Sequence, residues 1–150
     1  MKPTAISLFS GAGGLDVGFE KAGFKTIFAN EFDHDAASTW RANRPNNCTV
    51  MHEGDIVGEL ASISQYYGQA DIVFGGPPCQ GFSVAGKMDP NDSRSELIFT
   101  FLNVVELVAP KAFVMENVKA LGILDKWKTV RERFVSQGCP TNLGNTVIDC

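Results

Sequence analysis

The 150-residue sequence contains no apolar run close to the roughly 20 residues that a helix needs to cross a membrane. Its first residues carry one lysine and no long apolar core, which does not fit a secretory signal peptide. Four cysteines are present and no two form a CxxC pair, so neither a zinc site nor a disulfide framework is expected. We therefore expect no membrane contact, no bound metal, and an intracellular protein, cytoplasmic or, in a eukaryote, nuclear.

The sequence also lacks a surplus of basic residues. It has 13 lysine and arginine residues against 17 aspartate and glutamate residues, a formal net charge of −4. Proteins that bind nucleic acid usually present clustered cations to the phosphates. The composition therefore argues against nucleic-acid binding by these 150 residues on their own. Internal repeats, low-complexity tracts and interdomain linkers are absent too, which favours a single domain.

What the sequence does contain is an alternation of short apolar runs with amphipathic stretches, the pattern of β-α-β units around a parallel sheet. We expect a doubly wound α/β fold. The predicted strands are Thr4–Leu8, Lys25–Asn30, Val50–His52, Asp71–Phe74, Ala112–Met115 and Thr146–Cys150, and the predicted helices are Leu15–Ala22, Asp33–Arg44, Glu96–Val108 and Asp125–Gln137. Because the sequence stops on an apolar strand without a closing helix, we expect residues 1–150 to be one partial domain, cut after about the sixth strand of such a sheet.

A glycine-rich turn, Phe9–Gly14 (FSGAGG), joins the first strand to the first helix. Glycines in such a turn let a ligand approach the backbone near the positive end of the helix. The dinucleotide fingerprint GxGxxG is not met, because its third glycine position, counted from Gly11, is Asp16. Taken alone, these glycines are as consistent with a plain turn as with a binding site.

Two acidic residues follow the next two strands. Glu31 comes about twenty residues after the glycines, where an acidic side chain in such folds accepts hydrogen bonds from ribose hydroxyls. Asp55 follows the third strand and could accept a hydrogen bond from an adenine amino group. Either acid alone would more often be a solvated loop residue. Together with the glycine turn they favour an adenosine-containing cofactor, and none of these residues requires a pyrophosphate.

A loop of about twenty residues, 75–95, follows the fourth strand, and loops of this length in compact domains are commonly functional. Its first part reads GGPPCQGFS, in which Pro77 and Pro78 restrict the backbone directly before Cys79. A free cysteine is more often buried and inert. The surrounding Gly, Pro and Ser residues nevertheless favour a reactive thiol on a surface loop, which would need a lowered pKa or a nearby proton acceptor.

Glu116 comes just after the fifth strand and could face the same edge of the sheet as Cys79. In apolar surroundings the pKa of its carboxyl group would rise, and the group could then donate a proton. Taken alone, Glu116 would more often be a helix-capping or solvated acid.

In this order, these elements resemble the cytosine-5 DNA methyltransferase family. The matching stretches are LFSGAGGLDVGFE at 8–20, NEFD at 30–33, GDI at 54–56, GGPPCQGFS at 75–83, DSRSELIF at 92–99 and MENV at 115–118. The related amino-methylating enzymes have an aromatic residue after the two prolines, where this sequence has Cys79. The resemblance implies a Rossmann-like, S-adenosylmethionine-dependent methyltransferase fold.

The resemblance also implies a role for each matched residue. Cys79 would attack C6 of a cytosine flipped out of double-stranded DNA, while Glu116 contacts and protonates N3, so that C5 becomes nucleophilic enough to take the methyl group. Loss of the C5 proton would then expel the thiolate. The implied S-adenosylmethionine site comprises Phe9, Gly11, Ala12, Gly13, Gly14, Leu15, Glu31, Phe32, Asp55, Ile56, Pro78 and Leu97, and the implied DNA contacts are Gln80, Ser83 and Arg94.

Members of that family are longer than this sequence. They carry an arginine-containing QxRxR segment, a variable recognition region and a terminal helix, none of which occurs here. We therefore expect these residues alone to be inactive, and a complementing polypeptide to supply DNA recognition, in a restriction–modification setting. Two other functions stay open at this point: a cytosine-5 tRNA methyltransferase, and a non-catalytic, cofactor-binding subunit or remnant of a split enzyme.

Overall fold

A computed structural model describes residues 1–46, 49–78, 96–117 and 132 of the chain. Within them, strands and helices alternate. The strands are β1 (Thr4–Leu8), β2 (Lys25–Glu31), β3 (Met51–Glu53), β4 (Ile72–Gly75) and β5 (Ala112–Met115), and the helices are α1 (Gly14–Lys21), α2 (His34–Ala42), α3 (Ile56–Ser64) and α4 (Leu97–Val108). The predicted helix at 125–137 and strand at 146–150 lie outside the described residues, apart from residue 132.

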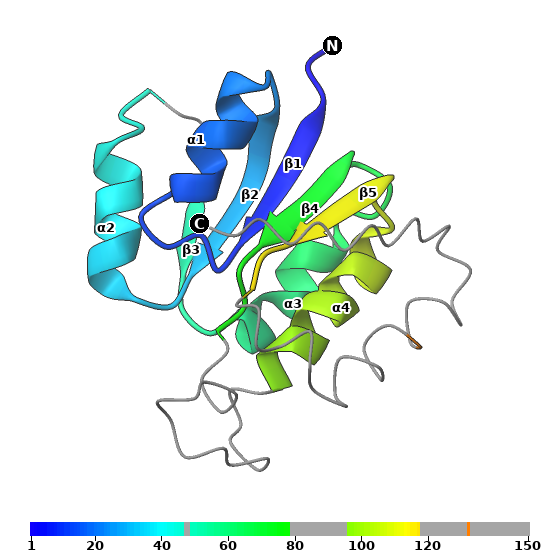
Figure 1. Cartoon of the computed structure of the whole chain (residues 1–150). Coiled ribbons are helices and arrows are strands. Elements are labelled where there is room, and N and C mark those ends of the chain that lie inside the picture. The colour runs from blue at the N-terminus through cyan, green and yellow to red at the C-terminus, as the bar shows by residue number, and fades with distance from the viewer. Residues whose placement is uncertain (47–48, 79–95, 118–131, 133–150) are drawn as a thin grey trace. The chain divides into compact units, whose positions relative to one another are not determined.

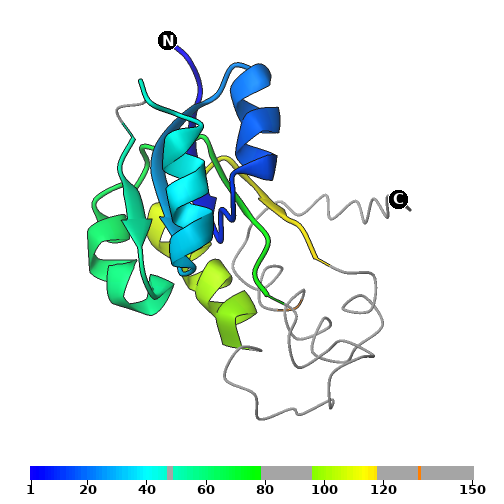
Figure 2. The same cartoon turned by 90° about the vertical axis from the view of Figure 1, so that its left-hand side faces the viewer.

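The five strands form one parallel sheet in the order β3-β2-β1-β4-β5. Helices α1 and α2 cover one face of this sheet and α3 and α4 the other (Figures 1 and 2). Crossovers between parallel strands are almost always right-handed. The chain first adds strands on one side of β1, up to β3, and then adds β4 and β5 on the other side, so the helices of the two halves cover opposite faces. The predicted doubly wound, parallel α/β fold is confirmed.

Reversal of the strand order places the carboxyl ends of β1 and β4 side by side. Their register pairs Ser7 with Phe74 and Leu8 with Gly75. In open α/β sheets, ligands bind beyond the carboxyl ends of strands at such a reversal point. The fold therefore brings the glycine-rich turn after β1 next to the Gly-Pro segment after β4.

Apolar packing on both faces holds the sheet in place. On the α1 side, the ring of Phe19 stacks on Phe74, with ring centroids 4.0 Å apart. On the α2 side, Trp40 is buried against Ala29 and Met51. On the opposite face, α4 buries most of its length, through Ile98, Thr100, Phe101, Leu102, Val104, Val105 and Val108.

The structure differs from the sequence-based prediction mainly at α3, which was not predicted. Elsewhere the differences are at the ends of elements: β2 continues to Glu31, and α2 ends at Ala42 rather than at Arg44. No helix in the described part of the chain is long and apolar enough to span a membrane.

Candidate functional site

A cavity of about 200 Å³ lies at the carboxyl ends of β1 and β4. The glycine-rich turn and the start of α1 form one wall, and the residues after β4 and β5 form the other. The residues that line it are Ser7, Leu8, Phe9, Ser10, Leu15, Asp16, Phe74, Gly75, Gly76 and Glu116. The cavity therefore lies where the topology places a ligand site.

The turn itself has an unusual backbone. Phe9, Gly11 and Gly13 adopt positive φ angles of 52°, 54° and 93°, and positive φ is uncommon for a residue such as Phe9 that carries a side chain. Gly13 has a second reason to be glycine, since a Cβ there would lie 2.5 Å from Nη1 of Arg44. The turn is thus a tight, defined structure and not a flexible linker.

Glu31, at the end of β2, is hydrogen-bonded to the backbone of this turn. One of its carboxylate oxygens accepts a hydrogen bond from the Gly11 amide at 2.7 Å, and the other accepts one from the Asp33 amide at 2.8 Å. A carboxylate has about four acceptor positions. Glu31 therefore braces the turn while keeping acceptor capacity for a ligand.

The other predicted residues near β2 and β3 differ in accessibility. The ring of Phe32 is 76% exposed, whereas the side chain of Ile56 is 2% exposed and lies in the core. Asp55 is the N-cap of α3, and its carboxylate accepts a hydrogen bond from the Val57 amide at 2.9 Å. Asp55 therefore has a structural role in addition to any contact with a ligand.

Across the cavity, the ends of β4 and β5 approach each other closely. The Glu116 amide donates a hydrogen bond to the Gly75 carbonyl at 2.9 Å. A Cβ placed on Gly76 would lie 3.0 Å from Oε2 of Glu116, so the Glu116 carboxylate rests against the backbone there. Two residues later, Pro78 is half-buried and is the last residue described before Cys79.

The structure brings three of the predicted site residues to this cavity: Phe9, Leu15 and Glu116. Gly11, Ala12, Gly13 and Gly14 belong to the neighbouring turn, and Glu31 is hydrogen-bonded to it, but none of these five residues lines the cavity. Phe32, Asp55, Ile56, Pro78 and Leu97 do not line it. Cys79, Gln80, Ser83 and Arg94 lie outside the described residues.

Asp16 is the most unexpected member of the site. It has no exposed surface, accepts hydrogen bonds from Nε1 of Trp40 at 2.9 Å and from Oγ of Ser7 at 3.0 Å, and lines the cavity. Burial raises the pKa of its carboxyl group, and the bonds from Trp40 and Ser7 partly offset this rise. The sequence marked Asp16 only as the residue that breaks the GxGxxG pattern.

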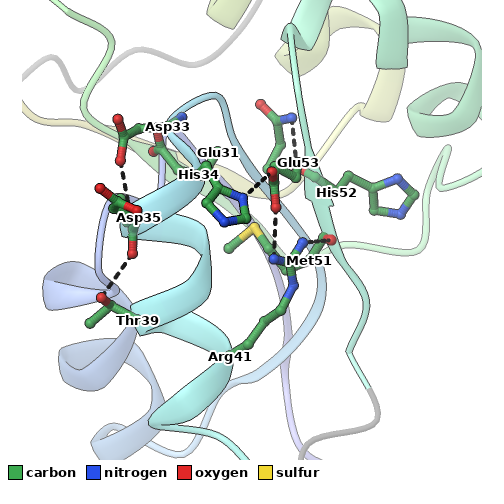
Figure 3. Close-up of polar contacts among 11 residues, drawn as sticks. Glu31, Asp33, His34, Asp35, Thr39, Arg41, Met51, His52 and Glu53 are labelled. Carbon is green, nitrogen blue, oxygen red and sulfur yellow. Dashed lines mark hydrogen bonds and ion pairs between the residues drawn. The ribbon is translucent and has the colours of Figure 1, made fainter.

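A second polar cluster lies beside the carboxyl ends of β2 and β3 (Figure 3). Glu53 accepts hydrogen bonds from Nδ1 of His34 at 2.7 Å and from Nη1 of Arg41 at 2.8 Å. The Glu53 carboxylate raises the pKa of His34, while Arg41 and His34 lower the pKa of Glu53. These contacts fasten α2 to β3. Among the described residues, no group of His, Cys, Asp and Glu could hold a metal ion.

Comparison with known proteins agrees with this geometry. Residues 4–137 match the family of C-5 cytosine-specific DNA methylases. The chain is 47% identical over 129 residues to the Type II methyltransferase M.AquIA of Picosynechococcus, covering 81% of this chain and 50% of that protein. It is 41% identical over 147 residues to the Type II methyltransferase M1.HphI of Haemophilus parahaemolyticus, covering 92% of this chain and 39% of that protein. The chain therefore spans half or less of the length of these relatives.

Solved structures give the same result for the fold. A protein described as a DNA modification methyltransferase encoded within an E. coli prophage is 33% identical, with a TM-score of 0.72 over 89% of this chain and 37% of that one. The S. pombe Dnmt2 methyltransferase has the same TM-score over 91% of this chain and 41% of its own, at 18% identity, which supports the fold alone. The family match covers most of the sequence and includes both walls of the cavity. The chain belongs to the C-5 cytosine-specific DNA methylase family.

Proposed function

We propose that the complete protein transfers a methyl group from S-adenosylmethionine to C5 of cytosine in double-stranded DNA. One observation carries this proposal: the Glu116 carboxylate and the Gly-Pro segment that leads to Cys79 border the same cavity as the glycine-rich turn. The proposed proton donor, the residues that precede the proposed nucleophile and part of the proposed cofactor turn thus border one small space. Such convergence of polar groups in one cavity is typical of an active site.

The residues present fit S-adenosylmethionine. Phe9 and Leu15 give the cavity apolar surface, Glu31 retains acceptor capacity for ribose hydroxyls, and the exposed ring of Phe32 is available to stack on an adenine. Asp55, exposed at the start of α3, would accept from the adenine amino group. The remaining residues of the proposed cofactor site are Gly11, Ala12, Gly13, Gly14, Ile56, Pro78 and Leu97. When bound, this cofactor supplies an electrophilic methyl group on a sulfonium ion.

The chain's own residues would then carry out the rest of the reaction. The Cys79 thiolate adds to C6 of the flipped cytosine, and Glu116 holds and protonates N3, so that negative charge does not build up on the ring. C5 becomes the nucleophile. After methyl transfer, a base removes the C5 proton, the thiolate leaves C6 and N3 returns its proton to Glu116, which restores the aromatic ring. Gln80, Ser83 and Arg94 would contact the DNA.

Covalent trapping tests the proposed nucleophile. Double-stranded DNA with 5-fluorocytosine at the target should form a stable adduct in the presence of cofactor, because fluorine cannot leave as a proton does. Cys79→Ser should abolish the adduct and leave cofactor binding within about twofold, since the hydroxyl is nearly the same size but a far weaker nucleophile. Denaturing gel electrophoresis measures the adduct. An undiminished adduct in the variant would exclude Cys79.

The same assay can also test the substrate and the need for a partner polypeptide. We propose that DNA binding needs sequence equivalent to the remaining part of the longer relatives, in this protein or in a second polypeptide, because these 150 residues carry a net charge of −4. The trapping assay is therefore run with and without such a polypeptide, on duplex DNA and on tRNA. The names of the relatives, Type II methyltransferases, support DNA as the substrate and a restriction–modification role. An adduct with tRNA and none with duplex DNA would overturn both the DNA substrate and the restriction–modification role.

A further inference from the structure

A buried polar network lies beside the glycine-rich turn, and three of its members, Ser7, Ser10 and Asp16, also line the cavity. Its centre is Asp16, which accepts hydrogen bonds from the Trp40 indole and the Ser7 hydroxyl. The Ser7 and Ser10 hydroxyls are hydrogen-bonded at 2.8 Å, and the Ser10 amide donates to the Asn30 carbonyl at 3.0 Å. The network therefore connects α1 and α2 with the first residues of the turn.

Arg44 extends this network to the other end of the turn. Its side chain is only 5% exposed and donates to the Gly13 carbonyl at 3.3 Å and to the Glu20 carboxylate at 2.7 Å. Its guanidinium carbon lies 4.5 Å from the centre of the Trp40 ring. Trp40 thus contacts both Asp16 and Arg44.

A network of this kind has a specific consequence. Burying a carboxylate, a guanidinium and two hydroxyls is unfavourable unless each finds partners with good geometry, and when they do the arrangement becomes rigid. The turn needs such rigidity, since Phe9 holds a positive φ angle that is unfavourable for a residue with a side chain. A core of apolar residues would fill the same space without fixing the direction of the Ser10 and Gly13 backbone groups.

We propose that Asp16 and Trp40 are positioning residues for the cofactor: through hydrogen bonds, they hold the glycine-rich turn in its binding conformation before the cofactor arrives. This inference rests on the proposed function for the identity of the ligand. It assigns to α2 a part in cofactor binding that none of the sequence motifs indicated. The effect is one of preorganisation, in which the turn loses little freedom on binding.

Three substitutions test the proposal. Trp40→Phe keeps an aromatic ring beneath Arg44 but removes the donor to Asp16, and Asp16→Ala removes the acceptor. Each should raise the dissociation constant of S-adenosylhomocysteine, measured by calorimetry on the full chain, by about tenfold or more, the scale of one lost hydrogen bond to a charged group. Asp16→Asn should bind within about threefold of wild type, because its amide can accept from Trp40 and donate to the Ser7 hydroxyl.

A matched control separates positioning from general loss of stability. Ile63→Ala creates a cavity at a fully buried site in α3, on the opposite face of the sheet. It should lower the melting temperature at least as far as Trp40→Phe and leave the dissociation constant unchanged. If Trp40→Phe and Asp16→Ala bind as tightly as wild type, or if Asp16→Asn is as weak as Asp16→Ala, the proposal is wrong.

Hydrogen exchange provides a readout that needs no cofactor. The Gly13 amide, bonded to the Ser10 carbonyl at 2.9 Å, should exchange faster in Trp40→Phe and in Ser7→Ala but not in Asp16→Asn or Ile63→Ala. Equal exchange in all variants would also overturn the proposal. If the wild-type chain binds neither S-adenosylmethionine nor S-adenosylhomocysteine, the proposed cofactor is wrong. The exchange data then decide by themselves whether the network positions the turn.

Discussion

At the end of β4, the backbone of Gly75 lies so close to β1 that no side chain fits between them. A Cβ at this position would be 2.1 Å from the carbonyl oxygen of Leu8. The obstacle is backbone in a fully buried strand, so it cannot rotate aside as a flexible side chain could. Gly75 therefore sets the separation of the two strands whose ends form the floor of the cavity.

Gly75→Ala should for this reason destabilise the fold by about 3 kcal/mol, at the upper end of the usual cost of overpacking a core. Urea denaturation measures the change. Gly58→Ala is the matched control, because Gly58 lies in α3 with nothing within 4 Å of its Cβ position, and alanine there should stabilise by about 0.5–1 kcal/mol. Equal stability of the two variants would contradict the close approach of β1 and β4.

Single residues were predictable where a motif carries the chemistry. The turn residue Phe9 and the acid Glu116 were both selected from the sequence, and both line the cavity. Asp16 and Gly75 were not selected, because their importance depends on contacts between distant segments. Asp16 meets Trp40 across 24 residues, and Gly75 meets Leu8 through strand pairing, so neither contact leaves a local pattern.

Among the secondary-structure elements, α3 is the one that the sequence analysis missed. Only Ile56 and Ile63 of this helix are buried, and Gly58 lowers its helix propensity, so the periodic signal is weak. The sequence analysis weighed Asp55 as a ligand for adenine or as a solvated loop residue, and neither interpretation includes its role as the N-cap of a helix. The parallel arrangement of β3 and β4 was the better clue, since such a connection needs a crossover, usually a helix.

The N-cap role of Asp55 and its proposed contact with adenine together lead to a prediction with two separable effects. Asp55→Ala should cost about 1 kcal/mol of stability through the lost cap and should also weaken cofactor binding. Asp55→Ser should restore the cap, because a serine hydroxyl also accepts from the helix amides, but should not restore binding if the longer carboxylate reaches the adenine. Thermal melting and calorimetry measure the two effects. If serine restores both, Asp55 acts only through α3.

For the molecule as a whole, the alternation of apolar and amphipathic segments was enough to predict a doubly wound parallel sheet. The order of the strands does not follow from local patterns. It depends on where the chain crosses from one side of β1 to the other, and this crossing places the β1 and β4 ends together. The charge pairs that fasten the opposite end of the sheet could not be predicted for the same reason.

One group of these contacts surrounds Asp71, directly before β4. Its carboxylate is bonded to Nζ of Lys111 at 2.6 Å, before β5, and to the amide of Thr4 at 2.7 Å, at the start of β1. The bond from Lys111 and those from Thr4 lower the pKa of Asp71 from 3.8 to about 2. One acidic group therefore ties three neighbouring strands together at their amino ends.

This pKa fixes the direction of a pH effect on stability. Because the carboxyl group is more acidic in the folded chain than in the unfolded one, its contribution is fully present above pH 3.8 and is lost as the pH falls through about 2. Asp71→Asn should thus be less stable than wild type at neutral pH, and the difference should shrink across that acidic window. Lys111→Met, which removes the main partner, should behave in the same way. Thermal melts from pH 7 down to pH 2 measure the effect, and parallel curves for wild type and Asp71→Asn would show that Asp71 does not fasten the sheet.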